Sequence, residues 1–289
     1  MGDLSSYQPV VIIGAARSGT NMLRDALTRV VGIGTWPCDE INYIWRHGNC
    51  RHPDDEFTPE MATPAVRKFI RRAFERMARR LDVRYLVEKT CANSLRVGFV
   101  DRIVPEAKYL FLVRDGRDVV ASAMKRWKAR LDIPYILRKA RFVPLGDLPY
   151  YGLRYLRNRV ARALSKERQL AFWGPRFEGI QRALRECCLA EVCALQWSRS
   201  TQLSEEHLSG IDNERVYRLR YEDFVRSPAE EFLRITASLG IDCSAEKASE
   251  VSKSVSGASV GKWERDEEKE AVLRALPLMQ ESLNRYGYE

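Results

Sequence analysis

A short apolar run that ends in a glycine loop, close to the N-terminus, is the feature that most constrains the fold of this chain. Residues 10–13 are all β-branched and are bounded by Pro9 and Gly14, which predicts a buried strand. Residues 20–30 then carry apolar side chains at helical spacing. A strand that passes through a glycine loop into a helix is the opening unit of an α/β fold.

The loop at residues 14–21, GAARSGTN, has the G-x-x-x-x-G spacing of a phosphate-binding loop. In such a loop the backbone N–H groups and the helix N-terminus bind a phosphate. Thr20 and Asn21 stand where a nucleotide-hydrolysing protein has its lysine and its magnesium-binding hydroxyl group. The positive charge is Arg17, inside the loop. The pattern therefore favours a phosphate site that needs no magnesium.

Further strands are predicted at residues 85–87, 109–113 and 216–219. Helical patterns lie between them, including one long basic amphipathic helix at 58–81 and another capped by Ser94. From 131 to 180 four prolines break the alternation into short helices. We expect a P-loop NTPase-like three-layer α/β fold, with a central parallel sheet flanked by helices. The whole chain, 1–289, would form one domain with a basic helical insertion at about 131–180.

A second anion-binding pattern follows the most apolar of these strands. The segment 113–122, VRDGRDVVAS, places Arg114 at the end of the strand and Ser122 two turns into the next helix. Arg126 lies one turn further along the same helical face. We expect this face to bind a second phosphate by charge-assisted hydrogen bonds. A structural ion pair is the alternative role for Arg114.

Together, the two segments resemble those of the sulfotransferase family, and the tyrosylprotein and carbohydrate sulfotransferases in particular. The resemblance continues in three places: residues 88–90 (EKT), residues 219–224 (LRYEDF), and residues 259–263 (SVGKW) with the ending at 286–288. Cys91 stands where bacterial members usually have a proline after E-K-T. The resemblance covers the two ends of the chain well and residues 130–210 poorly.

This resemblance implies that the sulfuryl donor is PAPS (3′-phosphoadenosine 5′-phosphosulfate), that PAP is the product, and that no metal takes part. The glycine loop would bind the 5′-phosphosulfate, and Arg114 with Ser122 the 3′-phosphate. Arg17 and Lys89 are the catalytic candidates for the leaving phosphate, Tyr221 is a candidate for the adenosine, and Ser259 and Lys262 for closure over the 3′-phosphate. The donor-binding candidates are Arg17, Ser18, Gly19, Thr20, Asn21, Arg114, Ser122, Arg126, Tyr221, Ser259 and Lys262.

The general base is predicted to be a carboxylate. In tyrosylprotein sulfotransferases a glutamate follows the first helix, and Glu40 occupies the corresponding region of this chain. Asp39 and His47 remain alternatives. A carboxylate serves as a base at working pH if burial raises its pKa. The acceptor is expected to be a hydroxyl group of a glycan, a lipid-linked glycan, a peptide tyrosine or a small molecule.

Positive charge is concentrated in residues 125–168, which hold 13 Lys or Arg and three Asp or Glu, whereas the whole chain carries +9. Three interpretations of this segment stay open. They are a solvated basic face, peripheral docking through 131–168 on anionic lipid, and a lid over an acidic or glycan acceptor. Because the segment resembles the family least, we expect it to decide acceptor choice.

The composition restricts the other classes of function. No apolar run reaches the roughly 18 residues of a membrane span, and the start does not resemble a secretion signal. Seven cysteines without a CxxC pair favour a reducing compartment, hence the cytoplasm. Cys38, His47, Cys50 and His52 match no zinc spacing, so we expect no metal.

Two alternative functions remain. A P-loop kinase-like phosphotransferase is disfavoured by the missing lysine in the loop. A non-enzymatic nucleic-acid-binding protein is suggested by net charge alone, and since no nucleic-acid-binding motif is present we expect no nucleic acid partner. The sequence does not indicate an oligomeric state.

Overall fold

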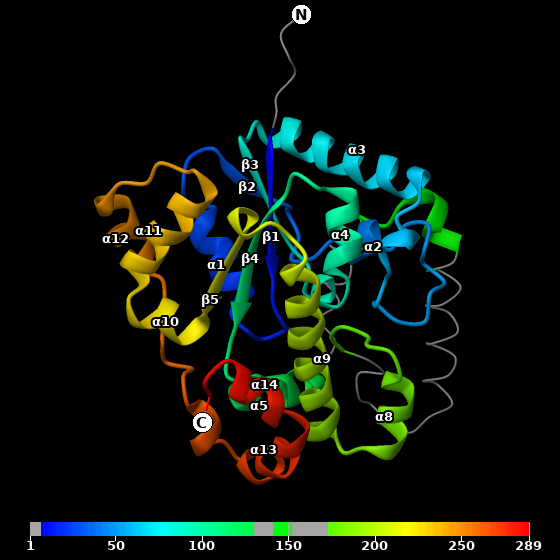
Figure 1. Ribbon diagram of the computed structural model, residues 1–289, viewed down its shortest axis with the longest axis vertical. Coiled ribbons are helices and arrows are strands. Elements are labelled where there is room, and N and C mark those ends of the chain that lie inside the picture. Colours follow the sequence, from blue (N-terminus) through cyan, green and yellow to red (C-terminus); the bar gives the residue numbers. More distant parts are fainter. Residues whose placement is uncertain (1–6, 130–140, 150, 152–172, 289) are drawn as a thin grey trace, which may run out of the picture.

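Five parallel strands form the centre of the molecule. The computed structural model describes residues 7–129, 141–149, 151 and 173–288 (Figure 1). The strand order is β2-β3-β1-β4-β5, and the sheet is parallel throughout. The strands are β1 (Gln8–Ile13), β2 (Ile33–Thr35), β3 (Tyr85–Lys89), β4 (Lys108–Val113) and β5 (Val216–Arg220). Four of the five were predicted; β2, three residues long with a central glycine, is too short to give an apolar pattern.

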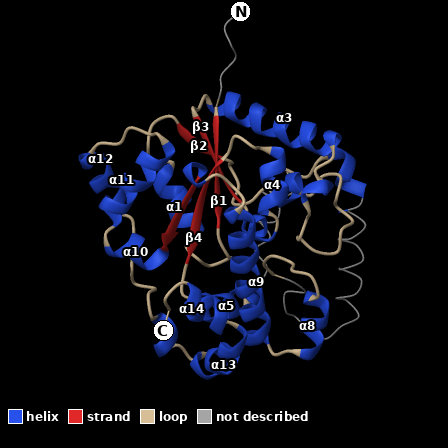
Figure 2. Ribbon diagram, viewed as in Figure 1, coloured by secondary structure: helices blue, strands red, loops and turns tan. Residues whose placement is uncertain are grey.

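Helices cover both faces of the sheet, so the predicted three-layer α/β fold is confirmed (Figure 2). Even-numbered β1 residues such as Ile12 pack with α1, α10, α11 and α12, and odd-numbered ones such as Ile13 pack with α3, α4, α5 and α9. The helices named here are α1 (Thr20–Leu27), α3 (Pro64–Leu81), α4 (Val97–Ile103), α5 (Gly116–Lys128), α9 (Leu189–Ser209), α10 (Tyr221–Arg226), α11 (Pro228–Leu239) and α12 (Ala245–Ser252). Shorter helices are α2 (Asn42–Trp45), α8 (Ile180–Glu186), α13 (Lys269–Ala275) and α14 (Gln280–Arg285).

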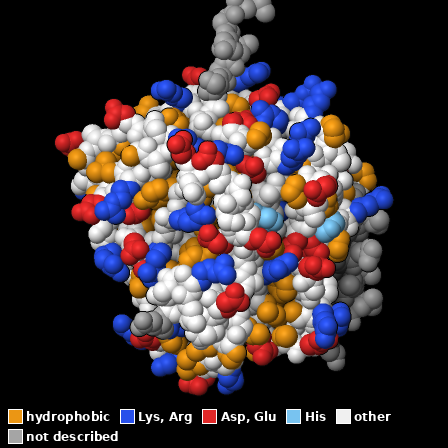
Figure 3. Space-filling model, in the orientation of Figure 1, with side chains coloured by type: hydrophobic (Ala, Val, Ile, Leu, Met, Phe, Trp, Pro, Cys, Tyr) orange, Lys and Arg blue, Asp and Glu red, His pale blue; other side chains and the backbone are white. Residues whose placement is uncertain are grey.

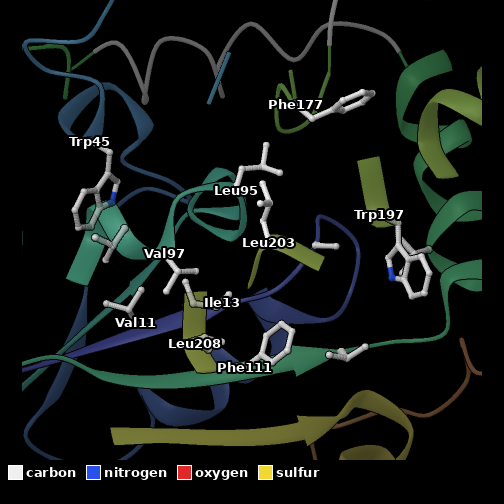
Figure 4. Close-up of a cluster of buried hydrophobic side chains, with 14 of the residues drawn as sticks. Val11, Ile13, Trp45, Leu95, Val97, Phe111, Phe177, Trp197, Leu203 and Leu208 are labelled. Carbon is white, nitrogen blue, oxygen red and sulfur yellow. The ribbon is translucent and has the colours of Figure 1, made fainter. Parts of the chain in front are cut away.

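The larger of the two cores lies between the sheet and α9. Figure 4 shows Val11 and Ile13 of β1, Phe111 of β4 and Leu208 of α9 among its buried side chains. Because successive residues of a strand point to opposite faces, the apolar run of β1 supplies both cores at once. This explains why every residue of β1 after Gln8 is buried.

The strand register brings the candidate site residues to one edge of the sheet. Ile12 of β1 pairs with Lys89 of β3, and Ile13 pairs with Phe111 of β4. Val113 of β4 pairs with Arg220 of β5. The segments that follow the carboxyl ends of β1, β3, β4 and β5 therefore emerge side by side, where α/β proteins bind ligands.

Two predicted helix starts are wrong. Residues 58–81 do not form one helix: a 3₁₀ turn at Pro59–Met61 is followed by α3, which begins at Pro64. Thr63 caps α3 by accepting a hydrogen bond from the Val66 N–H, and proline is tolerated only in a first helical turn. Ser94 does not cap α4, because its hydroxyl donates to the Cys91 carbonyl inside a 3₁₀ turn, and α4 starts at Val97.

The predicted insertion at 131–180 falls largely outside the described residues. Within the described parts of the chain, no helix is both long enough and apolar enough to cross a membrane. The basic segment is therefore represented by its flanks: the end of α5, residues 141–149, Tyr151 and the loop before α8.

Close packing between α5 and α9 gives a first prediction. A Cβ on Gly116 would lie 2.7 Å from Cε3 of the Trp197 ring, whose indole N–H donates to the Arg114 carbonyl. Gly116→Ala is expected to displace the indole and lower the free energy of unfolding by about 2 kcal/mol, measured by urea denaturation. Gly146→Ala is the control, since a Cβ there meets no atom of the described residues within 4 Å. Equal stability of the two variants would contradict the prediction.

Candidate active site

The loop after β1 has the backbone of an anion-binding turn. Arg17 and Gly19 have φ of 75° and 91°, on either side of Ser18. Alternating left-handed residues turn successive N–H groups inward, which forms a concave site for an anion. A Cβ on Gly14 would lie 2.7 Å from the Leu112 carbonyl oxygen, and one on Gly19 would lie 2.5 Å from the Tyr221 ring. Both glycines are thus required by close approach, as the G-x-x-x-x-G spacing indicated.

The glycine loop contains a positively charged side chain, a buried hydroxyl group and no carboxylate. Ser18 is fully buried, and its hydroxyl has no hydrogen-bond partner in the structure described. The Arg17 side chain donates from Nε to Ser122 Oγ at 2.9 Å. Burial and the charges of Arg126 and Arg114 lower the pKa of Arg17. An anion placed between these arginines would reduce their mutual repulsion. It would also give the buried Ser18 hydroxyl a hydrogen-bond partner.

Arg114 connects the loop to the C-terminal part of the chain. Its guanidinium donates to the Arg17 carbonyl at 3.2 Å and to the Ser259 carbonyl at 2.5 Å. It also lies 3.3 Å from Asp118 Oδ2 and stacks over the Tyr221 ring, 4.5 Å from the centroid. The structural ion pair considered for Arg114 is therefore present, and the residue lies next to the loop and Tyr221 as well.

Asp118 and Tyr221 hold the segment that carries Ser259 and Lys262. Asp118 accepts hydrogen bonds from the backbone N–H groups of Gly261 and Trp263, at 2.9 and 3.0 Å. The Tyr221 hydroxyl lies 2.7 Å from Ser259 Oγ. Lys262 itself is exposed at the start of a 3₁₀ turn. The structure thus brings Ser259 to Arg114 and Tyr221 and leaves Lys262 on the surface beside them.

The remaining candidates lie on α1 and α5. Thr20 is buried in the first turn of α1, with its hydroxyl 3.9 Å from the Cys91 thiol. Asn21 is exposed next to it. Arg126 is half-buried on α5 and forms no ion pair with any residue that the structure describes. Its charge is therefore available to a ligand at the Arg17–Ser122 contact.

A second cluster groups Lys89 with the two candidate carboxylates. Lys89 Nζ is 3.3 Å from Glu40 Oε1 and 3.7 Å from Asp39 Oδ1. Glu40 Oε1 also accepts a hydrogen bond from the Cys91 N–H at 3.3 Å. Burial opposes the charge of Lys89, but the neighbouring Cys91, Glu40 and Asp39 outweigh it and raise the pKa of Lys89. The lysine therefore remains a cation.

The three candidate bases differ in their environments. Burial alone would raise the pKa of Asp39, yet Lys89 and a 2.8 Å hydrogen bond from Arg24 hold it below its usual value. His47 lies at the end of α2, 2.8 Å from Asp147 and stacked on Phe69. Asp39 is thus held in its ionised form, and His47 contacts residues outside the lysine cluster.

A buried glutamate that sequence reasoning did not assign supports the cluster. Glu88 is fully buried and accepts hydrogen bonds from Thr90 Oγ1 at 2.5 Å and Asn93 Nδ2 at 2.9 Å. Thr90 Oγ1 in turn accepts from the backbone N–H of Ile41 at 3.1 Å. Glu88 and Thr90 thus fix the backbone next to Glu40. The signal in the sequence is a charged residue inside an apolar strand, since such a residue needs buried partners.

The Cys38, His47, Cys50 and His52 cluster does not assemble into a metal site. In the described ranges, no group of three or more His, Cys, Asp or Glu side chains is placed to hold an ion. Cys38 donates to the Glu40 carbonyl, and His52 lies 3.2 Å from Asp54.

Part of the basic segment is visible at the end of α5. Lys125 pairs with Asp266 at 2.5 Å and Lys128 pairs with Glu268. Both lysines are thus neutralised by the C-terminal part of the chain. The basic side chains at 130–140 and 152–168 lie outside the described residues.

Comparison with known proteins agrees with this geometry. The model of the sulfotransferase family matches residues 9–141 and 153–245. No curated protein matches the sequence. A sulfotransferase from Mycobacterium avium superimposes with a TM-score of 0.54 at 11% identity, covering 98% of this chain and 78% of that one. The sulfotransferase domain of the Synechococcus olefin synthase gives 0.50 at 17% identity, with coverages of 90% and 82%.

A third solved structure, the sulfotransferase domain from the curacin biosynthetic pathway, gives a TM-score of 0.50 at 15% identity, with coverages of 84% and 77%. At such low identities the similarity shows the fold of these proteins, a helix-flanked parallel sheet. The assignment of individual site residues rests on the geometry described above.

Burial of Glu88 predicts a dependence of stability on pH. Burial raises the pKa of Glu88 from 4.5 to about 7, so the folded state favours the protonated form. Its contribution is fully present below pH 4.5 and is lost as pH rises through about 7. Between these values the free energy of unfolding of the wild type should fall by on the order of 3 kcal/mol relative to Glu88→Gln.

The measurement is urea denaturation across this pH range, with Glu214→Gln, an exposed glutamate, as the control. Parallel stability curves for the wild type and Glu88→Gln would show that Glu88 is not the group responsible.

Proposed function

The chain belongs to the sulfotransferase family, and from this premise we propose that it transfers the sulfuryl group of PAPS to a hydroxyl group of an acceptor. One observation carries the proposal. Burial and the positive charges of Arg126 and Arg114 lower the pKa of Arg17 in the glycine loop. The buried Ser18 hydroxyl of the same loop lacks a partner among the described residues. This arrangement has donors and positive charge to spare, which suits the two phosphate groups of PAPS.

The roles in donor binding follow from position. The loop residues Arg17, Ser18, Gly19, Thr20 and Asn21 would hold the 5′-phosphosulfate with backbone and hydroxyl donors. The face of Arg114, Ser122 and Arg126 would hold the 3′-phosphate. Tyr221 would pack against the adenosine, and the segment of Ser259 and Lys262 would close over the phosphate. The Arg17–Ser122 hydrogen bond, at 2.9 Å, joins the two phosphate sites.

The cluster of Lys89 and Glu40 would perform the chemistry. In an in-line displacement the acceptor hydroxyl attacks sulfur while the bond from sulfur to the leaving phosphate oxygen breaks. Lys89 and Arg17 would stabilise the charge that develops on the leaving phosphate. We assign the base to Glu40, because Lys89 and the Arg24 hydrogen bond lower the pKa of Asp39 and so make it a weaker proton acceptor. Glu40 would take the hydroxyl proton, and the backbone at Ile41, fixed by Thr90 and Glu88, would hold it in place.

The acceptor is proposed to be a hydroxyl-bearing molecule, and its selection is assigned to the basic segment at 131–180. The family model leaves residues 142–152 of this segment unmatched, and the donor-binding candidates lie outside the segment, so variation in acceptor is expected within it. Glycans, lipid-linked glycans, peptide tyrosines and small molecules all carry a suitable group.

PAP binding tests the donor site. PAP should raise the melting temperature of the protein, whereas ATP with magnesium should not, since ligand binding to the native state stabilises it. Arg126→Ala should weaken PAP affinity by about 10–100-fold, the loss of one charge-assisted interaction. Lys128→Ala is the matched control on the same helix, because Lys128 already pairs with Glu268. Absence of any shift with PAP would refute the proposed donor.

Substitution of the two carboxylates tests the base. Glu40→Gln should lower turnover at least about 100-fold and leave the PAP-induced thermal shift unchanged, because only proton transfer is removed. Asp39→Asn is the matched control and should retain most activity. Turnover is measured as PAP released from PAPS with acceptor fractions of a cell extract. The reverse pattern, with Asp39→Asn inactive and Glu40→Gln active, would assign the base to Asp39.

A further inference from the structure

The outer face of α3 carries a row of basic side chains. It lies towards the amino ends of the strands, whereas the candidate active site lies at their carboxyl ends. Lys68, Arg72, Arg76 and Arg79 are all exposed and recur every three or four residues, so they lie on one side of the helix. None of them pairs with a carboxylate in the part of the chain that the structure describes. Figure 3 shows Lys and Arg side chains along the upper right of the molecule, where α3 lies in Figure 1.

Exposed aliphatic side chains adjoin the C-terminal end of this face. The loop before β2 packs against the end of α3, since the Arg84 N–H donates to the Gly32 carbonyl at 2.9 Å. Val31, beside Gly32, is 96% exposed, and Leu81 is 37% exposed. Arg84, in the short segment that joins α3 to β3, is also exposed. We call Lys68, Arg72, Arg76, Arg79, Arg80, Leu81, Arg84 and Val31 the α3 surface.

The acidic residues near the α3 surface do not cancel its charge. Glu75 is half-buried on the side of α3 that faces Arg71 and Tyr7. Glu106 is taken up by Arg71 at 2.9 Å. Asp82, at the end of the helix, is the one exposed acid in α3 and its C-cap. Six basic side chains of the α3 surface thus face solvent with one acid beside them.

We propose that the α3 surface binds an anionic lipid bilayer peripherally. Basic side chains near a membrane are attracted to anionic headgroups, and exposed aliphatic side chains are stabilised by entering the interface. The α3 surface combines an almost fully exposed valine with arginines that form no ion pair with the described residues. It therefore offers a membrane both an aliphatic side chain and positive charge. A single-stranded nucleic acid is less favoured, because single strands bind by stacking on aromatic side chains. The nearby aromatics are engaged: Phe69 stacks on His47, and the Tyr85 hydroxyl donates to the Gly240 carbonyl.

The position of the surface sets the orientation of the bound protein. The end of α3 leads directly into the amino end of β3, whereas the candidate site lies at the carboxyl ends of the strands (Figure 1). A bilayer on the α3 surface would therefore leave the carboxyl edge of the sheet facing the aqueous phase. This inference does not depend on the proposed sulfuryl transfer.

Sedimentation with lipid vesicles tests the inference. The wild type should sediment with phosphatidylcholine vesicles that contain phosphatidylserine and stay in solution with phosphatidylcholine alone. Each arginine near the bilayer contributes roughly a five-fold gain in affinity, so Arg72→Gln, Arg76→Gln and Arg79→Gln together should cost about 100-fold. Val31→Ser should cost about five-fold. The matched control replaces the exposed Arg185, Arg226 and Arg274 by Gln and should bind like the wild type.

Each other outcome overturns the inference. Undiminished vesicle binding by the triple α3 variant would assign the lipid contact to another surface, such as the basic segment at 125–168. Retention on duplex DNA or heparin that depends on the three arginines, with no effect of Val31→Ser on vesicle binding, would make the α3 surface a general polyanion site. Circular dichroism of each variant confirms that surface substitutions leave the fold intact, as expected for exposed helical positions.

Discussion

The guanidinium group of Arg114 is the contact on which the arrangement of the candidate site depends. It donates hydrogen bonds to the backbone carbonyls of Arg17 in the glycine loop and of Ser259 in the C-terminal segment. It also forms an ion pair with Asp118. Asp118 in turn holds the N–H groups of Gly261 and Trp263. Three segments far apart in the sequence are thereby assembled around one charge. Two of these bonds end on backbone carbonyls, which anchor the guanidinium, and the Asp118 carboxylate balances its charge.

At the same edge of the sheet, the two candidate carboxylates gather around a different cation. Glu40 and Asp39 are gathered around Lys89, which follows β3, whereas the arginines gather around the loop after β1 and the helix after β4. A reaction that moves an anionic group needs this division, since cations must face the group that leaves and a carboxylate must face the proton that is removed. Glu88 is fully buried next to this cluster. Burying a glutamate without hydrogen-bond partners is unfavourable. Its position is explained by Thr90 and Asn93, whose hydrogen bonds fix the backbone beside Glu40.

Local patterns were enough to predict the frame of the molecule. The apolar runs of β1, β3, β4 and β5 and the glycine loop are properties of neighbouring residues, so the strand ends and the loop were found without tertiary information. β2 was missed because it gains stability from pairing with β3 and not from its own three residues. The proposed choice of Glu40 over Asp39 also needed the fold: adjacent acids look alike in a sequence, whereas in the structure Arg24 of α1 binds Asp39. His47 was separated from the cluster by its contacts with Asp147 and Phe69, which come from distant segments.

The positive charge of the chain divides into groups with different physical environments. Lys125 and Lys128 are paired with acids of the C-terminal segment and contribute little attraction for a ligand. Of the arginines at the loop, Arg114 is buried, Arg126 is half-buried and Arg17 is exposed. Because they lie close enough to repel one another, a small polyanion that fits between them is favoured over a broad surface. The arginines of α3 are exposed and adjoin Val31 and Leu81, so they suit a wide, soft anionic surface. The arrangement of the charges, gathered around one loop or spread along one helix face, therefore distinguishes the proposed nucleotide site from the proposed bilayer site.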